Sequence, residues 1–317
     1  MSASKAQVAD KVLTDHARGY MPGMFVHDRI FPNVDVMARA GKIIVFGKEG
    51  LVKRDLKRAR GASRQQLSFD YGQDSYQTQQ VALDGVVPFE DLEDADAVPG
   101  VDLGKSATSM TLDNALLQTE IEAAELATKV SNFASTNKSA LTGKAQWDHA
   151  ESTPGKAVST ACKVIADSAG MSPNTLTVSE SVHKALIYNP DVVDRIKYTS
   201  SAEAGNISHA QMAAYFDVEF YAVGKARRVT DDGSKFQEVW GNNAVLSISG
   251  LSTMRDAEAH RGRQSLGYTY RLSGYPVVGE AWQDRDRNVW RYPVTIESVC
   301  VLASAASGYL FSDVISA

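Results

Sequence analysis

The chain has 317 residues, more than one hydrophobic core usually supports, so its length favours two domains or one domain with long excursions. Hydrophobic residues make up 44% of the chain and charged residues 22%. These values are typical of globular proteins and exclude a disordered, collagen-like or coiled-coil chain. The formal net charge of -5 does not favour nucleic-acid binding as the main function.

The small number of cysteines and the lack of long apolar runs indicate the cellular compartment. Two cysteines, Cys162 and Cys300, are too few for a disulfide framework, so we expect two buried free thiols in a reducing compartment. The first residues contain no apolar run, so no signal peptide is expected. No stretch is apolar enough to predict a membrane span. The sequence therefore indicates a soluble protein that is made inside a cell.

Charge is strongly segregated in one part of the chain. Residues 39–64 contain nine basic and two acidic residues, a net charge of +7. Residues 65–104 contain nine acidic residues and neither lysine nor arginine, a net charge of -9. The small overall charge therefore hides two large opposing segments that lie next to each other.

The first hundred residues predict an arm followed by a long excursion. Residues 5–18 have weak helical spacing, which Pro22 and Gly23 interrupt. Because little of the segment 1–40 is amphipathic, we expect an arm with few ways to bury itself alone. Residues 41–92 combine a short strand at 42–46 with alternating apolar residues from 67 to 81, which predicts a polar, hairpin-like excursion. Excursions of this length usually bind another chain or have another function.

The rest of the chain predicts an α+β arrangement. Asp113 is a suitable N-cap for a long helix over 113–136, whose apolar residues recur at helical spacing. A second helix is expected over 156–168, with Pro154 at its start and Gly170 after its end. Ser179 is a suitable N-cap for a short helix. Further strands are expected at 174–178, 218–223, 244–248, 266–270, 275–278 and 290–302.

A search for chemical motifs finds no site for an enzyme. The segment 142–145 resembles the end of a phosphate-binding loop, but Ala145 replaces the hydroxyl that binds the metal. The six histidines are too scattered for a metal site. Two Ser-x-x-Lys patterns, at 135–138 and 181–184, lack the accompanying motifs of serine acyl-transfer enzymes. We therefore predict no catalytic residue, no cofactor and no bound metal.

The two charged segments are interpreted as contacts between copies of the chain. The basic run has no interleaved aromatic residue to stack on bases, and the acidic segment lacks the spacing of a calcium loop. A basic loop laid over the acidic segment of a neighbour gains charge complementarity and a fixed register. The predicted contacts are Lys53, Arg54, Lys57, Arg58, Arg60 and Arg64 in the loop, and Glu90, Asp91, Glu93 and Asp94 in the acidic segment.

Several stretches resemble one protein family in their order and spacing. The segment PNTLTVSESVHKAL at 173–186, followed by NPDVVDRIKY at 189–198, is similar to the axial-domain signature of the major capsid proteins of tailed bacteriophages. The resemblance covers nearly the whole chain, and its other parts lie at 31–36, 41–49, 216–226 and 240–246.

The resemblance implies the Johnson fold, an α+β shell fold shared with encapsulins. Its parts are an N-terminal arm, an extended β-hairpin loop, a peripheral domain with a long spine helix, and an axial domain. In this chain they correspond to 1–40, to 41–92, to 93–155 with 266–299, and to 156–265 with 300–317. Some relatives cross-link their subunits through a loop lysine, and Lys48, Lys53 and Lys57 lie where such a lysine falls. No matching asparagine and catalytic glutamate are assigned, so we interpret these lysines as solvated contacts to a neighbour.

The function implied by the resemblance is structural. The protein is expected to self-assemble, as hexamers and pentamers, into an icosahedral shell that encloses double-stranded DNA with weak, non-specific contacts. Because no scaffolding segment precedes the arm, scaffolding is expected to come from a separate protein or from a segment already removed. A portal and in some cases a decoration protein are also expected. The expected location is the virion, after synthesis in the cytoplasm of a host bacterium. The alternatives are an encapsulin-type shell that holds a cargo enzyme, and a soluble α+β enzyme with an unrecognised site.

Overall fold

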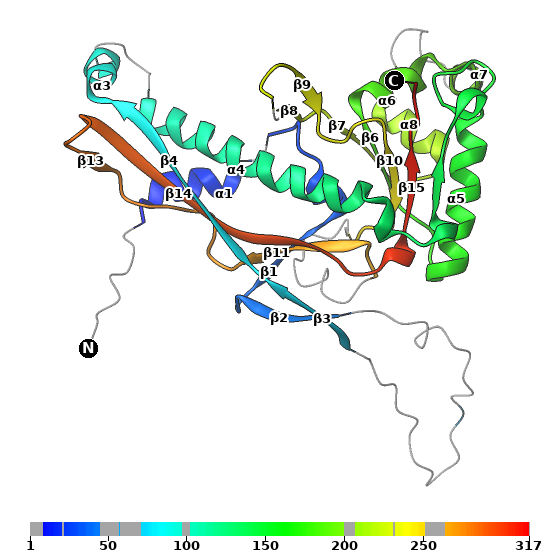
Figure 1. Cartoon of the computed structure of the whole chain (residues 1–317), viewed down its shortest axis with the longest axis horizontal. Coiled ribbons are helices and arrows are strands. Elements are labelled where there is room, and N and C mark those ends of the chain that lie inside the picture. Colours follow the sequence, from blue (N-terminus) through cyan, green and yellow to red (C-terminus); the bar gives the residue numbers. More distant parts are fainter. Residues whose placement is uncertain are drawn as a thin grey trace.

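The computed structural model describes residues 9–20, 22–44, 57, 71–96, 102–199, 207–230, 232–250 and 264–316. In this part of the chain, a long twisted sheet with a spine helix extends from a more compact α/β layer structure (Figure 1). The predicted α+β class is confirmed. The chain passes from the elongated part to the compact part and returns, so each contains residues from distant parts of the sequence.

The elongated part is organised around β14 (Val289–Leu302), the longest strand. β14 pairs in antiparallel fashion with β4 (Gln79–Pro88) along that strand's full length. On the other side it pairs with β11 (Gly267–Leu272), β12 (Val277–Val278) and β13 (Trp282–Asp284). β1 (Asn33–Val36) adds to β11 as a parallel strand. Strands that are far apart in sequence therefore meet on one ladder.

The spine helix α4 (Leu103–Thr128) packs against β4 and β14 and begins ten residues before the predicted N-cap. The side chain of Asp102 caps it by accepting a hydrogen bond from the backbone N of Lys105 at 3.0 Å. The predicted range 113–136 was therefore wrong at both ends, since short 3-10 turns at 130–132 and 135–137 follow the helix. Its first turns are rich in glycine, serine and threonine, which favour helices weakly, so packing on the sheet determines where it starts.

Close approach of the helix to the sheet depends on Gly85 in β4. A Cβ atom at this position would lie 2.9 Å from the hydroxyl oxygen of Thr111 and 3.0 Å from the carbonyl oxygen of Ala107. The hydroxyl of Thr111 donates to that same carbonyl at 2.7 Å, which satisfies it within the helix. A larger residue at 85 would push the helix away from the strand.

The N-terminal segment is more buried than the sequence suggested. Helix α1 (Lys11–Gly19), which Asp10 caps, packs on α4 and β12. Helix α2 (His27–Ile30) then brings Ile30 and Phe31 into complete burial. The sequence predicted an arm with few ways to bury itself alone, and residues 25–36 are buried against other elements of the chain. Their apolar side chains are covered by α4 and β11, contacts that the local sequence does not reveal.

The first part of the predicted excursion, residues 41–77, begins and ends on a two-stranded ladder. β2 (Ala40–Ile44) pairs with β3 (Tyr71–Gln77), and Ile44 lies opposite Tyr71. Residues 45–56 and 58–70 lie outside the described residues. Residues 79–88, assigned to the excursion from sequence, form β4 of the long sheet, and helix α3 (Phe89–Asp96) follows directly.

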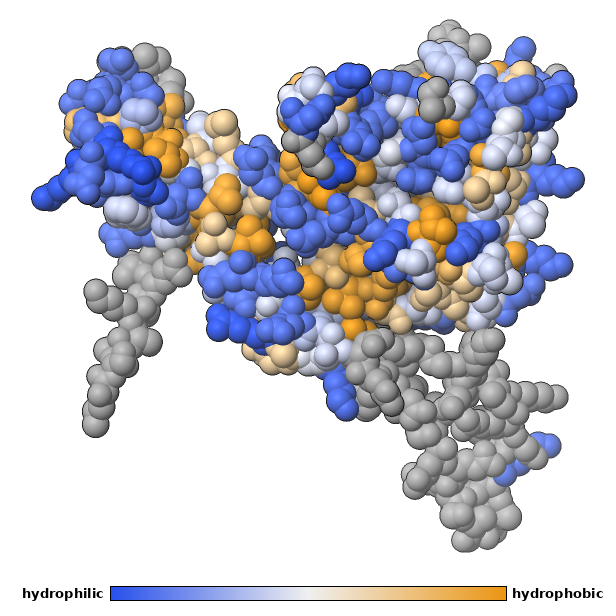
Figure 2. Space-filling model, in the orientation of Figure 1, coloured by the Kyte–Doolittle hydropathy of each residue, from blue (hydrophilic) through white to orange (hydrophobic). Residues whose placement is uncertain are grey.

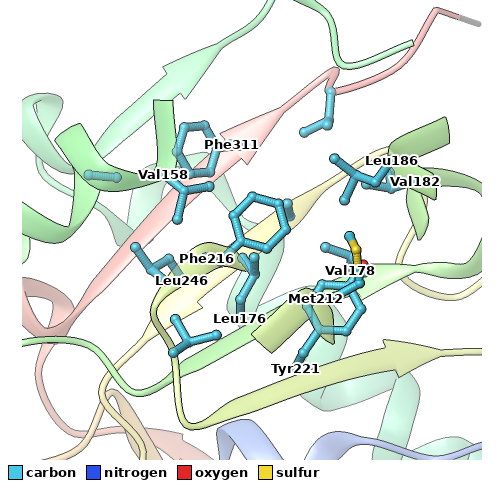
Figure 3. Close-up of a cluster of buried hydrophobic side chains, with 14 of the residues drawn as sticks. Val158, Leu176, Val178, Val182, Leu186, Met212, Phe216, Tyr221, Leu246 and Phe311 are labelled. Carbon is cyan, nitrogen blue, oxygen red and sulfur yellow. The ribbon is translucent and has the colours of Figure 1, made fainter. Parts of the chain in front are cut away.

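The compact part is a five-stranded sheet flanked by helices. Its strand order is β5 (Lys138–Ala140), β15 (Gly308–Ser312), β10 (Ala244–Ser247), β6 (Thr175–Ser179) and β7 (Phe220–Gly224). The helices are α5 (Pro154–Ala169), α6 (Glu180–Tyr188), α7 (Pro190–Thr199) and α8 (His209–Phe216). Aliphatic and aromatic side chains from both layers meet in one core, which includes Leu176, Met212, Phe216 and Phe311 (Figure 3).

Local signals predicted the ends of these helices correctly. Pro154 occupies the first turn of α5, and Gly170 ends it with a left-handed φ of 75°. The hydroxyl of Ser179 accepts from the backbone N of Val182 and caps α6. A separate hairpin of β8 (Arg227–Val229) and β9 (Phe236–Glu238) lies between the two parts (Figure 1).

Candidate assembly surfaces

The four predicted acidic contacts lie together on helix α3. Glu90, Asp91, Glu93 and Asp94 are all exposed, at the end of the long sheet that is remote from the compact part (Figure 1). The helix is held to the adjacent turn, because the Asn288 side-chain amide donates to the Glu90 carboxylate at 3.0 Å. The backbone N of Phe89 also donates to the Asn288 carbonyl at 3.1 Å. The acidic segment is therefore a fixed, solvent-facing surface.

The predicted basic contacts fall mostly outside the described part of the chain. Lys53, Arg54, Arg58, Arg60 and Arg64 lie outside the described residues, as does Lys48. Lys57 is described and is exposed. The contact between the loop and α3 of a neighbour therefore stays a prediction.

A groove beside α3 was not predicted from the sequence. It lies between β4 and the first turns of α4, with a volume of about 390 Å³, and its lining includes Leu83, Val86, Met110 and Asp91. The side chain of Met110 is 68% exposed, and Figure 2 shows apolar surface among hydrophilic residues at this end. The groove was missed because Met110 precedes the helix start that the sequence predicted.

A buried carboxylate joins three segments at the middle of the spine helix. Glu120 is fully buried, and it accepts hydrogen bonds from the backbone N atoms of Val26, at 3.1 Å, and His27, at 2.8 Å. The Nδ1 atom of His27 lies 2.8 Å from the same carboxylate. The indole N–H of Trp240 donates to its other oxygen at 2.7 Å. A buried carboxylate is tolerated only with such partners, so this cluster fixes the N-terminal segment and the Trp240 loop to α4.

The sequence analysis missed this role of Glu120, although one signal was present. On a helix, positions 120, 123, 124 and 127 share a face, and the other three are alanines that are buried here. A carboxylate on a face of small residues indicates a close partner. The partners themselves lie about 95 residues before it and 120 residues after it, which no local pattern shows.

A second polar cluster lies in the compact part. The Nδ1 atom of His183 is 3.0 Å from the hydroxyl of Tyr221, and its ring stands edge-on to His209. Burial, together with the nearby His209 and Lys225, lowers the pKa of His183 to about 4. Burial raises the pKa of Tyr221. The tyrosine is therefore the donor and the neutral imidazole the acceptor.

Residues that resembled catalytic groups have ordinary structural partners. The hydroxyl of Ser181 donates to Glu238 at 2.8 Å, and the ammonium of Lys184 pairs with Glu180 at 2.9 Å. Burial raises the pKa of the Cys300 thiol to about 11, which makes it a poor nucleophile at neutral pH. Within the described ranges, no cluster of three metal-ligating side chains occurs. None of the described helices is long and apolar enough to cross a membrane.

The fold resembles that of an encapsulin. It superposes on an encapsulin of Synechococcus elongatus with a TM-score of 0.55 at 10% identity, covering 99% of this chain and 92% of the other. At that identity the likeness concerns the fold alone.

Relatives of higher sequence identity are a phage-related protein and a phage protein. A phage-related protein of Bordetella bronchiseptica superposes with a TM-score of 0.82 at 34% identity, covering 99% of this chain and 100% of the other. The major capsid protein of Burkholderia phage BcepMu is 29% identical over 318 residues, covering 98% of each chain. Residues 112–292 match the family model for phage major capsid protein E. The chain belongs to this family, whose members are structural proteins, and it is a structural capsid protein of a tailed phage. The family predicted from the motifs is therefore confirmed.

Proposed function

We propose that this capsid protein self-assembles, as hexamers and pentamers, into the icosahedral shell that encloses the double-stranded DNA of the virion. The principal contact is the basic loop of one copy on helix α3 of the next. The observation that supports it is the exposed helix α3, which carries four carboxylates predicted to face a basic partner. The encapsulin alternative rests on a likeness at 10% identity, whereas the phage-related protein shares 34%.

The length of the loop limits how far it can extend from the subunit. Twenty-six residues separate Ile44 from Tyr71, which lie opposite each other at the end of the β2–β3 ladder. A chain of that length, leaving and returning at one point, reaches at most about 45 Å. Basic residues 53–60 occupy the middle of this stretch, where the reach is greatest. We propose that the contact with a neighbour lies within this reach.

Other partners follow from the same proposal. A separate scaffolding protein sets the size of the shell, a portal occupies one vertex, and a decoration protein attaches in some relatives. A net-acidic subunit contacts the packaged DNA weakly and without sequence preference, because the DNA backbone is attracted mainly to clustered cations. The protein acts in the virion after synthesis in the host cytoplasm, and it catalyses no reaction.

Charge reversal in the loop tests the principal contact. We expect Arg58→Glu with Arg60→Glu to abolish particle formation while the subunit stays folded, and Glu93→Arg with Asp94→Arg in the same chain to restore it. A matched control is Lys156→Glu with Lys163→Glu on the exposed face of α5, which should leave the yield unchanged. Electron microscopy and sedimentation measure particles. Wild-type yield from the loop variant would refute the contact, and a small monodisperse oligomer from the wild-type chain would refute the shell.

A further inference from the structure

The base of the loop meets the long sheet at two short connections, which together we call the joint. Residues 37–39 connect β1 to β2, and Thr78 alone connects β3 to β4. β2 and β3 form a separate two-stranded sheet, whereas β1 and β4 belong to the long sheet. Figure 1 shows the β2–β3 ladder projecting from that sheet. The geometry of the joint therefore determines the direction in which β2 and β3 leave the subunit.

A buried carboxylate on β14 binds both connections of the joint. The side chain of Glu297 is only 2% exposed. The Nε atom of Arg39 donates to its Oε1 atom at 2.8 Å, and the hydroxyl of Thr78 donates to the same oxygen at 2.9 Å. The backbone N of Thr78 also donates to the carbonyl of Arg39 at 2.8 Å. Each connection thus supplies one side-chain donor to the same residue of the long sheet.

Aromatic packing holds the ladder close to the sheet without setting its angle. The ring of Tyr76 in β3 stacks on Tyr270 in β11, with centroids 4.2 Å apart. The same ring covers Gly41 of β2, where a Cβ atom would lie 2.8 Å from the ring. Stacked rings tolerate a range of offsets, whereas hydrogen bonds are directional. The contacts to Glu297 are therefore the ones that select a single orientation.

The orientation of the joint seen here is the one that satisfies Glu297. A carboxylate taken out of water is costly unless it keeps hydrogen-bonding partners. Within the part of the chain that the structure describes, its side-chain donors are those of Arg39 and Thr78. Rotation of the joint would withdraw both donors together. The buried carboxylate therefore favours this orientation over others.

We propose that Glu297 is a positioning residue for the loop, which latches the joint and fixes the direction of β2 and β3 before a neighbour is met. This inference rests on the proposed function, in which the loop carries the principal contact. A segment that is already oriented loses less freedom on binding, so the latch lowers the subunit concentration needed for assembly. Because its side chain is buried, Glu297 acts through Arg39 and Thr78 and does not itself touch the neighbour.

Hydrogen exchange at the Thr78 amide of the unassembled subunit tests the latch. We expect Glu297→Gln, which removes the charge that holds Arg39, to speed exchange of this amide at least about tenfold. The backbone N of Gly279, which donates to the Pro293 carbonyl at 2.8 Å in the same long sheet, should exchange at an unchanged rate. Equal exchange of the Thr78 amide in the variant and the wild type would overturn the latch.

Variants of Arg39 provide a second test that does not alter a buried residue. Its side chain is 67% exposed, so its loss opens no core. We expect Arg39→Ala to speed exchange at Thr78 as Glu297→Gln does, and Arg39→Lys, which keeps the charge, to speed it less. The matched control is Arg271→Ala, which removes an ion pair with Asp35 of 2.9 Å between β1 and β11 and should leave exchange at Thr78 unchanged. An equal effect of this control would overturn the specific role of the latch.

Assembly, measured by sedimentation, tests the positioning role. We expect Glu297→Gln to raise the subunit concentration needed for particle formation at least about twofold, while circular dichroism shows that the subunit stays folded. An unchanged threshold despite faster exchange at Thr78 would overturn the positioning role. Failure of the wild-type chain to assemble would instead refute the proposed function, whereas the exchange experiment, made on unassembled subunits, tests the latch independently of it.

Discussion

The buried carboxylate of Glu120 provides a direct test of how the subunit is held together. We predict that Glu120→Gln strongly destabilises the subunit, although it preserves the shape of the side chain. The carboxylate offers only acceptors, and it receives donors from Val26, His27 and Trp240. A glutamine amide replaces one acceptor oxygen with an NH2 group. Whichever way the amide turns, its donor faces another donor inside a site that excludes water.

The size of the effect follows from the number of donors involved. If the NH2 group takes the position of Oε1, the indole of Trp240 loses its partner, which lies at 2.7 Å. If it takes the position of Oε2, the backbone N of His27 loses its partner at 2.8 Å. Each buried donor left unsatisfied costs about 1–3 kcal/mol, and disrupting a buried charged partner costs about 3–5 kcal/mol in total. We therefore expect a loss of about 3 kcal/mol in the free energy of unfolding.

Denaturant unfolding of the unassembled subunit measures this loss. Tryptophan fluorescence is a suitable probe, because Trp240 contacts the substituted group. Glu125→Gln on the same helix is the matched control, since that side chain is exposed and its loss should change the stability by less than about 0.5 kcal/mol. If the two glutamine variants unfold within about 1 kcal/mol of each other, Glu120 does not fasten the three segments as argued.

Two further predictions concern the packing and the pH response. Gly224→Ala should lower the free energy of unfolding by about 1–3 kcal/mol, because its Cβ would meet the ring of Trp240. Denaturant unfolding measures this loss. In the control Gly23→Ala, no atom lies within 4 Å of the added Cβ, so the free energy of unfolding should change by less than about 1 kcal/mol. Burial lowers the pKa of His183 to about 4 in the folded state, from the ordinary histidine value of 6.5. The unfolded state therefore binds more protons between these two values, and stability falls as the pH is lowered from 6.5. Unfolding midpoints between pH 6.5 and 4.5 should therefore decline less in His183→Gln than in the wild type, and equal declines would contradict this assignment.

The parts of the fold that were predictable are those whose signals are local. A proline at the start of α5, a glycine after its end and the Ser179 cap of α6 each act within a few residues, so the sequence reveals them. The start of α4 is different. Residues 103–111 favour a helix weakly, and β4, packed against them through Gly85, supplies the missing stabilisation. The burial of Ile30 and Phe31 likewise depends on strands more than two hundred residues away.

The candidate surfaces also differ in whether the local sequence could predict them. The exposure of the acidic residues on α3 was predictable, because a helix with four carboxylates in five positions has little to bury. The groove beside it was not, since it lies between β4 and the first turns of α4, which meet only in the folded chain. Composition therefore indicates which charges face outward, and only the fold shows which apolar residues lie beside them.

Some charged side chains form ion pairs within the subunit, whereas others are left for contacts with another molecule. Arg39 pairs with the buried Glu297 at 2.8 Å, and Arg291 pairs with Asp284. On α3, by contrast, Asp91, Glu93 and Asp94 form no ion pair with any described residue. Exposed ion pairs contribute about 0–1 kcal/mol to folding, so leaving these carboxylates unpaired costs the subunit little. If the basic loop of a neighbour covers these carboxylates, as proposed above, it relieves their mutual repulsion and favours the assembled state over the isolated subunit.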